Sequence, residues 1–220
     1  VIGIVMGGWA SNNKYSLLGG MRAVSQMISY EIPIALALLS IAALSGTLDL
    51  QEIINQQAGG FWNWFIFGGS GSLLKIIFIP FAIALFLVHF TSSLAETNRI
   101  PFDIPEGESE IVAGYHTEYS GMKFAMFFFA EYANMFTVSA ILTVCFFGGW
   151  QSPFGDFLND PIMQFVWFVL KSFFFVFVQI WLRWTLPRLR VDQLMYVSWK
   201  VMTPIAFVCF IALAIWGMIR

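Results

Sequence analysis

Long apolar runs alternate with short polar links along this chain. The runs at 23–45, 73–94, 122–147, 162–182 and 199–218 each reach the roughly 20 residues with which a helix crosses a bilayer. A shorter apolar run, Val1–Trp9, opens the chain, and we interpret it as the end of a span that begins outside this sequence. The pattern predicts an all-α, polytopic transmembrane helix bundle with about five full spans and one truncated span. We expect one membrane domain over residues 1–220.

The links between the runs differ in character. Ser11–Met21 is predicted to be a short polar link, and Gly46–Ser72 a longer connector. The connector holds an aromatic cluster at Phe61–Phe65, which suits the membrane interface and which a short surface helix could carry. Residues 95–122 are predicted to form an acidic loop, and Pro187–Ser198 a basic link.

Composition supports a membrane protein and argues against several other classes. Hydrophobic residues make up 59% of the chain and charged residues 11%, against about 25% charged residues in a soluble domain. The net charge of −2 and the lack of a basic arm give no reason to expect a nucleic-acid partner. Cys145 and Cys209 lie apart within apolar runs, so we expect neither a metal site nor an iron–sulfur cluster in this chain.

Basic residues are divided unequally between the two sides that antiparallel spans create. One side has only Lys75 and Arg220, and Lys171 lies within a span. Cytoplasmic links carry the excess of Lys and Arg, so the acidic loop and the basic link are expected on the cytoplasmic side, most simply of a bacterial inner membrane. The basic residues on that side are Lys14, Arg22, Arg99, Lys123, Arg183, Arg188, Arg190 and Lys200.

Acidic residues are concentrated from Glu96 to Glu131, around the link between the apolar runs 73–94 and 122–147. Seven of the 13 acidic residues lie in this interval, where charge beside the membrane is costly and usually functional. Three of them, Glu106, Glu108 and Glu110, are too close together to ionise fully, so we expect them to retain a shared proton. The alternative is a solvated loop that docks a partner.

Several polar side chains are predicted within the spans. Glu31 lies nine residues beyond Arg22 and Glu131 eight beyond Lys123, each about 12–13 Å along a helix, with no opposite charge within one turn. Such carboxylates can relay protons; the alternative is an ion pair with another helix, for example with Lys171, which itself is expected to pair with a carboxylate.

Polar residues at helical spacing mark the span at 73–94, and arginines mark the basic link. His89, Ser92, Ser93 and Glu96 fall on one helical face that should point toward the bundle interior or a hydrated path. His89 is either a relay group or a hydrogen-bonded core histidine. The arginines could anchor anionic lipid or bind an acidic partner protein; they are Arg183, Arg188 and Arg190.

Three long stretches resemble one known family. Residues 95–132 read AETNRIPFDIPEGESEIVAGYHTEYSGMKFAMFFFAEY, residues 9–31 read WASNNKYSLLGGMRAVSQMISYE, and residues 181–204 read WLRWTLPRLRVDQLMYVSWKVMTP. They resemble the quinone-site membrane subunits of respiratory complex I, the H-type family of NADH-quinone oxidoreductase subunits. The family fold has eight transmembrane helices, so the resemblance implies that this chain begins late in the third of them.

The resemblance also implies a function. Members form much of the tunnel through which quinone reaches a partner subunit, and they couple quinone reduction to proton pumping through buried carboxylates. Carried over, the proton-coupling residues are Glu31, Glu96, Asp103, Glu106, Glu108, Glu110, Glu118 and Glu131. The residues expected on the side of the quinone cavity are Arg22, Arg99, Asp103 and Glu106.

Cofactors and partners follow from the same resemblance. Quinone is expected as substrate, with FMN and the iron–sulfur clusters in partner subunits only. The implied partners are peripheral-arm subunits that carry the terminal cluster and the quinone headgroup site, small membrane subunits, antiporter-like subunits and the lipid bilayer. The alternative within this class is the related membrane subunit of an energy-converting, proton-pumping hydrogenase. A self-contained ion transporter and a structural scaffold are the alternatives from other classes.

Overall fold

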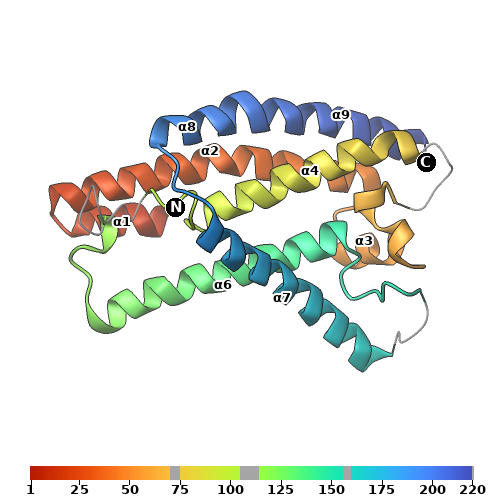
Figure 1. Ribbon diagram of the computed structural model, residues 1–220, viewed down its shortest axis with the longest axis horizontal. Helices are drawn as coiled ribbons and strands as arrows, with labels where there is room; N and C mark the ends of the chain where they lie inside the picture. Colours follow the sequence, from red (N-terminus) through yellow and green to blue (C-terminus); the bar gives the residue numbers. More distant parts are fainter. Residues whose placement is uncertain (70–74, 105–113, 156–159, 220) are drawn as a thin grey trace.

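The computed structural model describes residues 1–69, 75–104, 114–155 and 160–219, and within these ranges it contains helices and turns but no strand. Five helical stretches are long and apolar enough to cross a membrane, which confirms the predicted all-α bundle (Figure 1). The first four are α2 (Lys14–Ser45), α4 (Lys75–Glu96), α6 (Gly121–Phe146) and α7 (Pro161–Thr185). The fifth joins α8 (Val191–Tyr196), the π-helical segment η4 (Val197–Met202) and α9 (Thr203–Ile219).

Shorter elements fill the ends of the bundle. Helix α1 (Ile2–Ala10) packs against α2, and α3 (Leu50–Gln56) lies near α6. The described ranges also contain three single 3₁₀ turns: η1 (Phe61–Asn63), η2 (Phe65–Phe67) and η3 (Gly114–His116).

Helix α2 is the centre of the bundle. It packs against α1, α4 and α9, and α4 also packs against α9, while α6 and α7 pack against each other below this group (Figure 1). The interior between α2, α4 and α9 is filled by fully buried residues such as Leu85, Leu213 and Trp216. Small residues let the helices approach closely, because a Cβ on Gly217 of α9 would lie 2.6 Å from the Ala43 carbonyl oxygen of α2.

Parts of two predicted links are helical in the structure. Helix α2 begins at Lys14, where the Asn13 side chain accepts a hydrogen bond from the Tyr15 amide at 3.1 Å and so caps the helix. The first turns then pack on η3, with Gly19 so close to Gly114 that a Cβ would lie 2.6 Å from its Cα. These contacts stabilise the helix over residues 14–21, which we predicted to belong to the short polar link rather than to the span.

The basic link is shorter than predicted. Helix α8 begins at Val191, and only the segment between Thr185 and Val191 is non-helical. The Tyr30 hydroxyl of α2 donates to the Leu194 carbonyl at 3.0 Å, and Leu194 is 1% exposed. Burial against α2 therefore stabilises this short helix, which is too short to be stable in isolation.

The aromatic cluster of the connector forms turns η1 and η2 and is only partly at the surface. Trp62 is 64% exposed, as expected for an interfacial residue, but Phe65 is fully buried. The Phe65 amide donates to Gln57 Oε1 at 3.2 Å, which turns this residue inward. The segment thus lies at the surface through Trp62 and is fixed to the bundle through Phe65.

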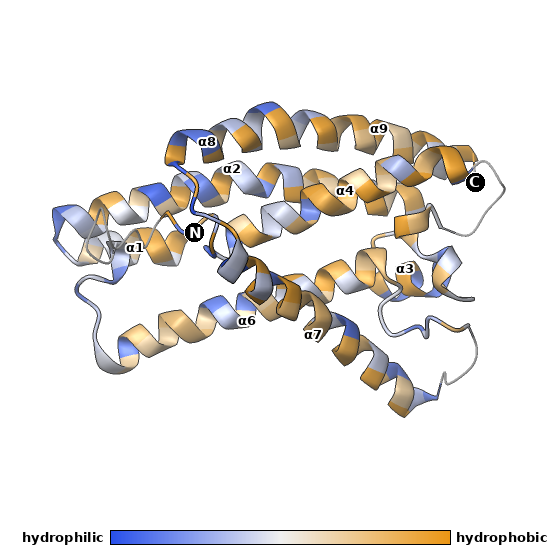
Figure 2. Cartoon of the chain, viewed as in Figure 1, coloured by the Kyte–Doolittle hydropathy of each residue, from blue (hydrophilic) through white to orange (hydrophobic). Residues whose placement is uncertain are grey.

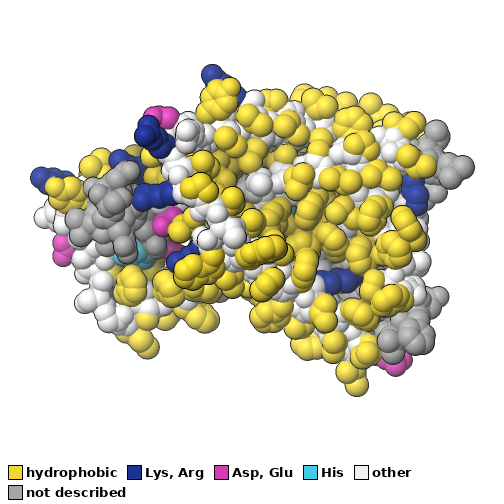
Figure 3. Space-filling view, in the orientation of Figure 1, with side chains coloured by type: hydrophobic (Ala, Val, Ile, Leu, Met, Phe, Trp, Pro, Cys, Tyr) yellow, Lys and Arg dark blue, Asp and Glu magenta, His cyan; other side chains and the backbone are white. Residues whose placement is uncertain are grey.

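The outer surface of the bundle is apolar along the length of the helices (Figures 2 and 3). Large hydrophobic side chains on α7 and α9 are more than half exposed, which suits contact with lipid rather than water. Lys and Arg side chains gather toward the end of the molecule where α2 begins (Figure 3). Representative exposed residues are Phe165, Phe174, Phe177, Trp184, Phe207 and Val208.

Candidate functional site

The described beginning of the acidic loop, residues 95–104, is fixed to α2 by one glutamine. Gln26 Nε2 donates to the carbonyl oxygens of Ala95 at 2.7 Å and Phe102 at 2.8 Å, and the residue is 2% exposed. The Leu189 amide donates to the Pro101 carbonyl at 3.1 Å, which joins the same segment to the link before α8. Sequence reasoning missed Gln26, although an amide within an apolar span is the signal that could have identified it.

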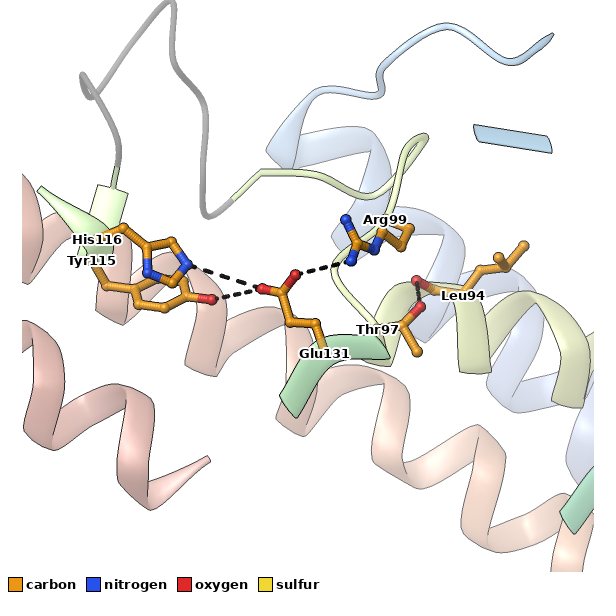
Figure 4. A network of polar contacts seen from close by, with 6 residues as sticks. All are labelled: Leu94, Thr97, Arg99, Tyr115, His116 and Glu131. Carbon is orange, nitrogen blue, oxygen red and sulfur yellow. Dashed lines mark hydrogen bonds and ion pairs between the residues drawn. The ribbon is translucent and has the colours of Figure 1, made fainter. Parts of the chain in front are cut away.

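Three described residues of the acidic loop lie around the carboxylate of Glu131 on α6 (Figure 4). Its Oε2 lies 3.3 Å from a guanidinium nitrogen of Arg99, and its Oε1 accepts a hydrogen bond from the Tyr115 hydroxyl at 3.1 Å. The His116 Nε2 lies 4.0 Å from the same Oε1. Arg99 comes from the segment after α4 and the other two from η3, so the carboxylate joins both described ends of the loop.

This arrangement changes the expectation for Glu131. The sequence offers no opposite charge within a helical turn, and Lys171 was the suggested distant partner. The ion pair is instead made by Arg99, whose guanidinium also lies 4.5 Å from the centre of the Tyr132 ring. Both charged side chains are largely buried, at 5% exposure for Arg99 and 12% for Glu131. The pair is therefore desolvated, and the loss of one partner would destabilise the other.

Glu96, at the end of α4, lies between two clefts. The outer cleft, of about 290 Å³, is lined by Glu96, Glu131, Tyr115 and Asn134 among others. The inner cleft, of about 330 Å³, is lined by Glu96, Glu31, His89 and Asn134 together with apolar side chains. Glu96 and Asn134 border both clefts. The carboxylates of Glu131, Glu96 and Glu31 therefore follow one another from the outer cleft to the inner cleft.

The predicted polar face of α4 is divided in the structure. His89 and Glu96 line the inner cleft, whereas the Ser92 hydroxyl donates to the Met202 sulfur at 3.5 Å. The Ser93 hydroxyl donates to the Phe90 carbonyl of its own helix at 2.7 Å. Only the histidine and the glutamate of this set therefore share a cleft with Glu31, which is exposed in the described chain.

The remaining candidate residues are spread over the loop side of the molecule. Glu118 is exposed, and its Oε1 accepts a hydrogen bond from Asn13 Nδ2 at 3.0 Å. Asp103 is partly buried, and its neighbour Ile104 lines a basic cleft of about 500 Å³ with Arg22 and with Arg188, Arg190 and Asp192. Three candidates lie outside the described residues: Glu106, Glu108 and Glu110.

Lys171 of α7 is held by carbonyl oxygens rather than by the carboxylate we expected. Its Nζ donates to the carbonyls of Phe147 at 2.8 Å, Gly149 at 3.1 Å and Gln151 at 2.7 Å. Phe147 is the C-cap residue of α6, and Gly149 and Gln151 lie in the link that follows the helix. The ammonium also lies 4.5 Å from the centre of the Trp64 ring. Within the described residues, Lys171 thus fixes the link after α6 to α7.

Known proteins with similar sequences indicate the family of this chain. The sequence model of the NADH dehydrogenase family matches residues 1–214. The H subunit of NADH-quinone oxidoreductase from Chlorobaculum tepidum is 55% identical, over 98% of this chain and 60% of its own length. The H subunits of Chlorobium luteolum and Protochlamydia amoebophila are 56% and 50% identical, over 98% and 97% of this chain and 58% and 59% of theirs. This chain therefore spans at most 60% of the length of these relatives, and it belongs to the NADH dehydrogenase family.

Proposed function

We propose that this chain is the proton-transferring part of the membrane subunit of a proton-translocating NADH-quinone oxidoreductase. In this proposal the carboxylates accept protons on the loop side and pass them inward along the helices. The observation that carries it is the position of Glu96, which borders the outer cleft with Glu131 and the inner cleft with Glu31. The names of the relatives favour the quinone enzyme over the hydrogenase alternative.

The ion pair between Arg99 and Glu131 suggests how the loop could control proton uptake. A largely buried carboxylate is less stable in its ionised form once the positive charge beside it is removed. If the segment after α4 withdraws Arg99, Glu131 loses the charge that compensates it and takes up a proton. Return of Arg99 expels that proton, and Glu96, which lines the outer cleft with Glu131, receives it.

Quinone chemistry would supply the reason for such a movement, because reducing a quinone to a quinol consumes two electrons and two protons. We place the quinone side of this chain at the loop, near Asp103 and the cleft lined by Arg22. Glu106, Glu108 and Glu110 belong to this side in the proposal, either as a group that shares a proton or as a docking surface. The electron carriers and the remaining partners belong to other subunits of the complex.

Substitutions in the assembled complex test the proposal. Glu96→Gln and Glu131→Gln keep the size and polarity of each side chain but remove its ability to carry a proton. We expect both variants to assemble and to lower the number of protons pumped per electron by at least twofold. The measurement is proton uptake or release against NADH oxidation in vesicles that contain the purified complex.

Glu52→Gln is the matched control, because Glu52 is an exposed carboxylate on α3, away from both clefts. It should pump like the parent complex. If Glu96→Gln also pumps with the parent ratio and rate in a fully assembled complex, the carboxylate path is wrong.

A further inference from the structure

His89 is an unusual buried residue in this bundle. Its side chain is 1% exposed, and neither ring nitrogen has a hydrogen-bond partner within the described residues. One face of the imidazole contacts the ring of Phe146, with 5.8 Å between the ring centres. A histidine that serves only to fill a core normally has at least one nitrogen hydrogen-bonded, because leaving a buried donor and acceptor unpaired is unfavourable.

The surroundings of His89 indicate what could satisfy these nitrogens. The residue borders the inner cleft, which has a volume of about 330 Å³ and is also lined by Glu31, Glu96, Asn134 and Thr137. A cavity that offers several polar groups and exceeds the roughly 30 Å³ that a water molecule occupies is one that water can fill. The carboxylates Glu31 and Glu96 would attract water into the cleft even without His89. The unpaired nitrogens of His89 are therefore a separate observation.

We propose that His89 binds water at the floor of the inner cleft and is a further proton-carrying residue, positioned beyond Glu96 on the way into the membrane. This inference rests on the proposed function and adds a residue to it. His89 lies seven residues before Glu96 on α4, about 10 Å deeper along the helix axis. The imidazole thus extends the proposed path past Glu96, within the cleft that Glu31 also lines.

The proton step balances without any other reactant. Protonated Glu96 gives its proton to a bound water as that water gives one of its own to a ring nitrogen of His89. One O–H bond of the carboxyl group breaks, one N–H bond forms, and the imidazole becomes an imidazolium. Glu31, which faces the same cleft from α2, can accept the proton by the reverse exchange. The polar residues of α6 that line the cleft, among those described, are the uncharged Asn134 and Thr137.

Three substitutions in the assembled complex test this role. His89→Phe keeps the ring packing on Phe146 but binds no proton, and His89→Gln keeps hydrogen bonding without carrying a proton. We expect each to lower the protons pumped per electron by at least twofold. His89→Ala leaves space beside the cleft, and added imidazole should restore part of the lost pumping, which a packing role cannot explain.

Thr91→Val is the control on the same helix, because the Thr91 hydroxyl donates to the Leu87 carbonyl of α4 at 2.7 Å and does not line the cleft. It should pump like the parent. Parent-like pumping in His89→Phe and His89→Gln, with pumping lost in Glu96→Gln, would exclude His89 and leave the carboxylate path intact. Failure of all three His89 variants to assemble, while Glu96→Gln assembles, would make His89 a packing residue. Parent-like pumping in Glu96→Gln contradicts the proposed function itself.

Discussion

Among single residues, two buried charges illustrate how this bundle stabilises ions. Lys171 is satisfied by three main-chain carbonyls that follow α6, which are fixed in position by the fold. Glu131 depends instead on the side chains of Arg99 and Tyr115, which come from the acidic loop. The first arrangement suits a permanent structural charge. The second can change when the loop moves, which is what a proton-coupling residue requires.

The ion pair gives a prediction about stability. Arg99→Met removes a guanidinium from beside a largely buried carboxylate, so we expect the free energy of unfolding to fall by about 3 kcal/mol. Adding Glu131→Gln to this variant removes the uncompensated charge and should recover much of the loss. The measurement is a double-mutant cycle by thermal or denaturant unfolding of the purified chain in detergent micelles.

The matched control is Lys123→Met. This variant removes an exposed positive charge from the first turn of α6, the helix that carries Glu131, and should change stability little. Equal losses for Arg99→Met with and without Glu131→Gln would show that the two side chains are not coupled.

Among the helices, the contact between α2 and η4 compensates a defect in hydrogen bonding. Pro33 lies inside α2 and has no N–H, so the carbonyl of Ser29, four residues earlier, loses its partner within the helix. The Ser198 hydroxyl of η4 donates to that carbonyl at 2.6 Å, and Ser198 is fully buried. Such repair by serine of a neighbouring helix is how proline is tolerated within membrane spans. It also fixes η4 beside the turn that carries Glu31.

Ser198→Ala should therefore lower stability by about 2 kcal/mol, because it leaves a buried carbonyl without a donor. That loss corresponds to roughly 4–8 °C in the midpoint of thermal unfolding for a chain of this size. The effect should shrink in a Pro33→Ala background, where the amide of residue 33 can bond the Ser29 carbonyl again.

Ser25→Ala serves as the control, since the exposed Ser25 hydroxyl bonds the Met21 carbonyl of its own helix at 2.9 Å. Its midpoint should stay within about 1 °C of the parent. If Ser198→Ala costs the same with and without Pro33, the hydroxyl does not repair the proline site.

Across the whole molecule, the apolar sides of the bundle and the gathering of Lys and Arg at one end define an axis through the membrane (Figure 3). Alternating helices place Asp49, after α2, at the opposite end from Ser120, before α6. The excess of basic residues predicts that the end with Ser120 is cytoplasmic. The orientation is thus a property of the complete arrangement of spans rather than of any one link.

Cysteine labelling checks this orientation. In intact cells a membrane-impermeant maleimide should label Asp49→Cys and leave Ser120→Cys unlabelled, and inverted vesicles should give the opposite result. Both positions are exposed in the described chain. The two native cysteines, Cys145 and Cys209, are 3% and 2% exposed and should add little background. Labelling of Ser120→Cys from outside intact cells would reverse the proposed topology.

Local features of the sequence are enough to predict the fold class and the number of spans, and they single out carboxylates as candidates for carrying protons. Membrane spans are readable because apolar length is a local property, and five of them were predicted and found. Glu31, Glu96 and Glu131 are recognisable as unusual, because charge within or beside an apolar span is costly wherever the chain folds. The first and last full spans were predicted to begin too late, at 23 and 199, since the preceding turns become helical only through contacts with η3 and α2.

Which groups meet depends on the tertiary structure. Arg99 reaches Glu131 over 32 positions of sequence, and Gln26 reaches Ala95 over 69, and no periodicity within one helix contains such pairings. The structure also separates Ser92 and Ser93 from the cleft that His89 and Glu96 share. It gives Lys171 carbonyl partners instead of a carboxylate. Side-chain partners in a bundle depend on helix rotation and loop path, which arise only when all the spans pack together.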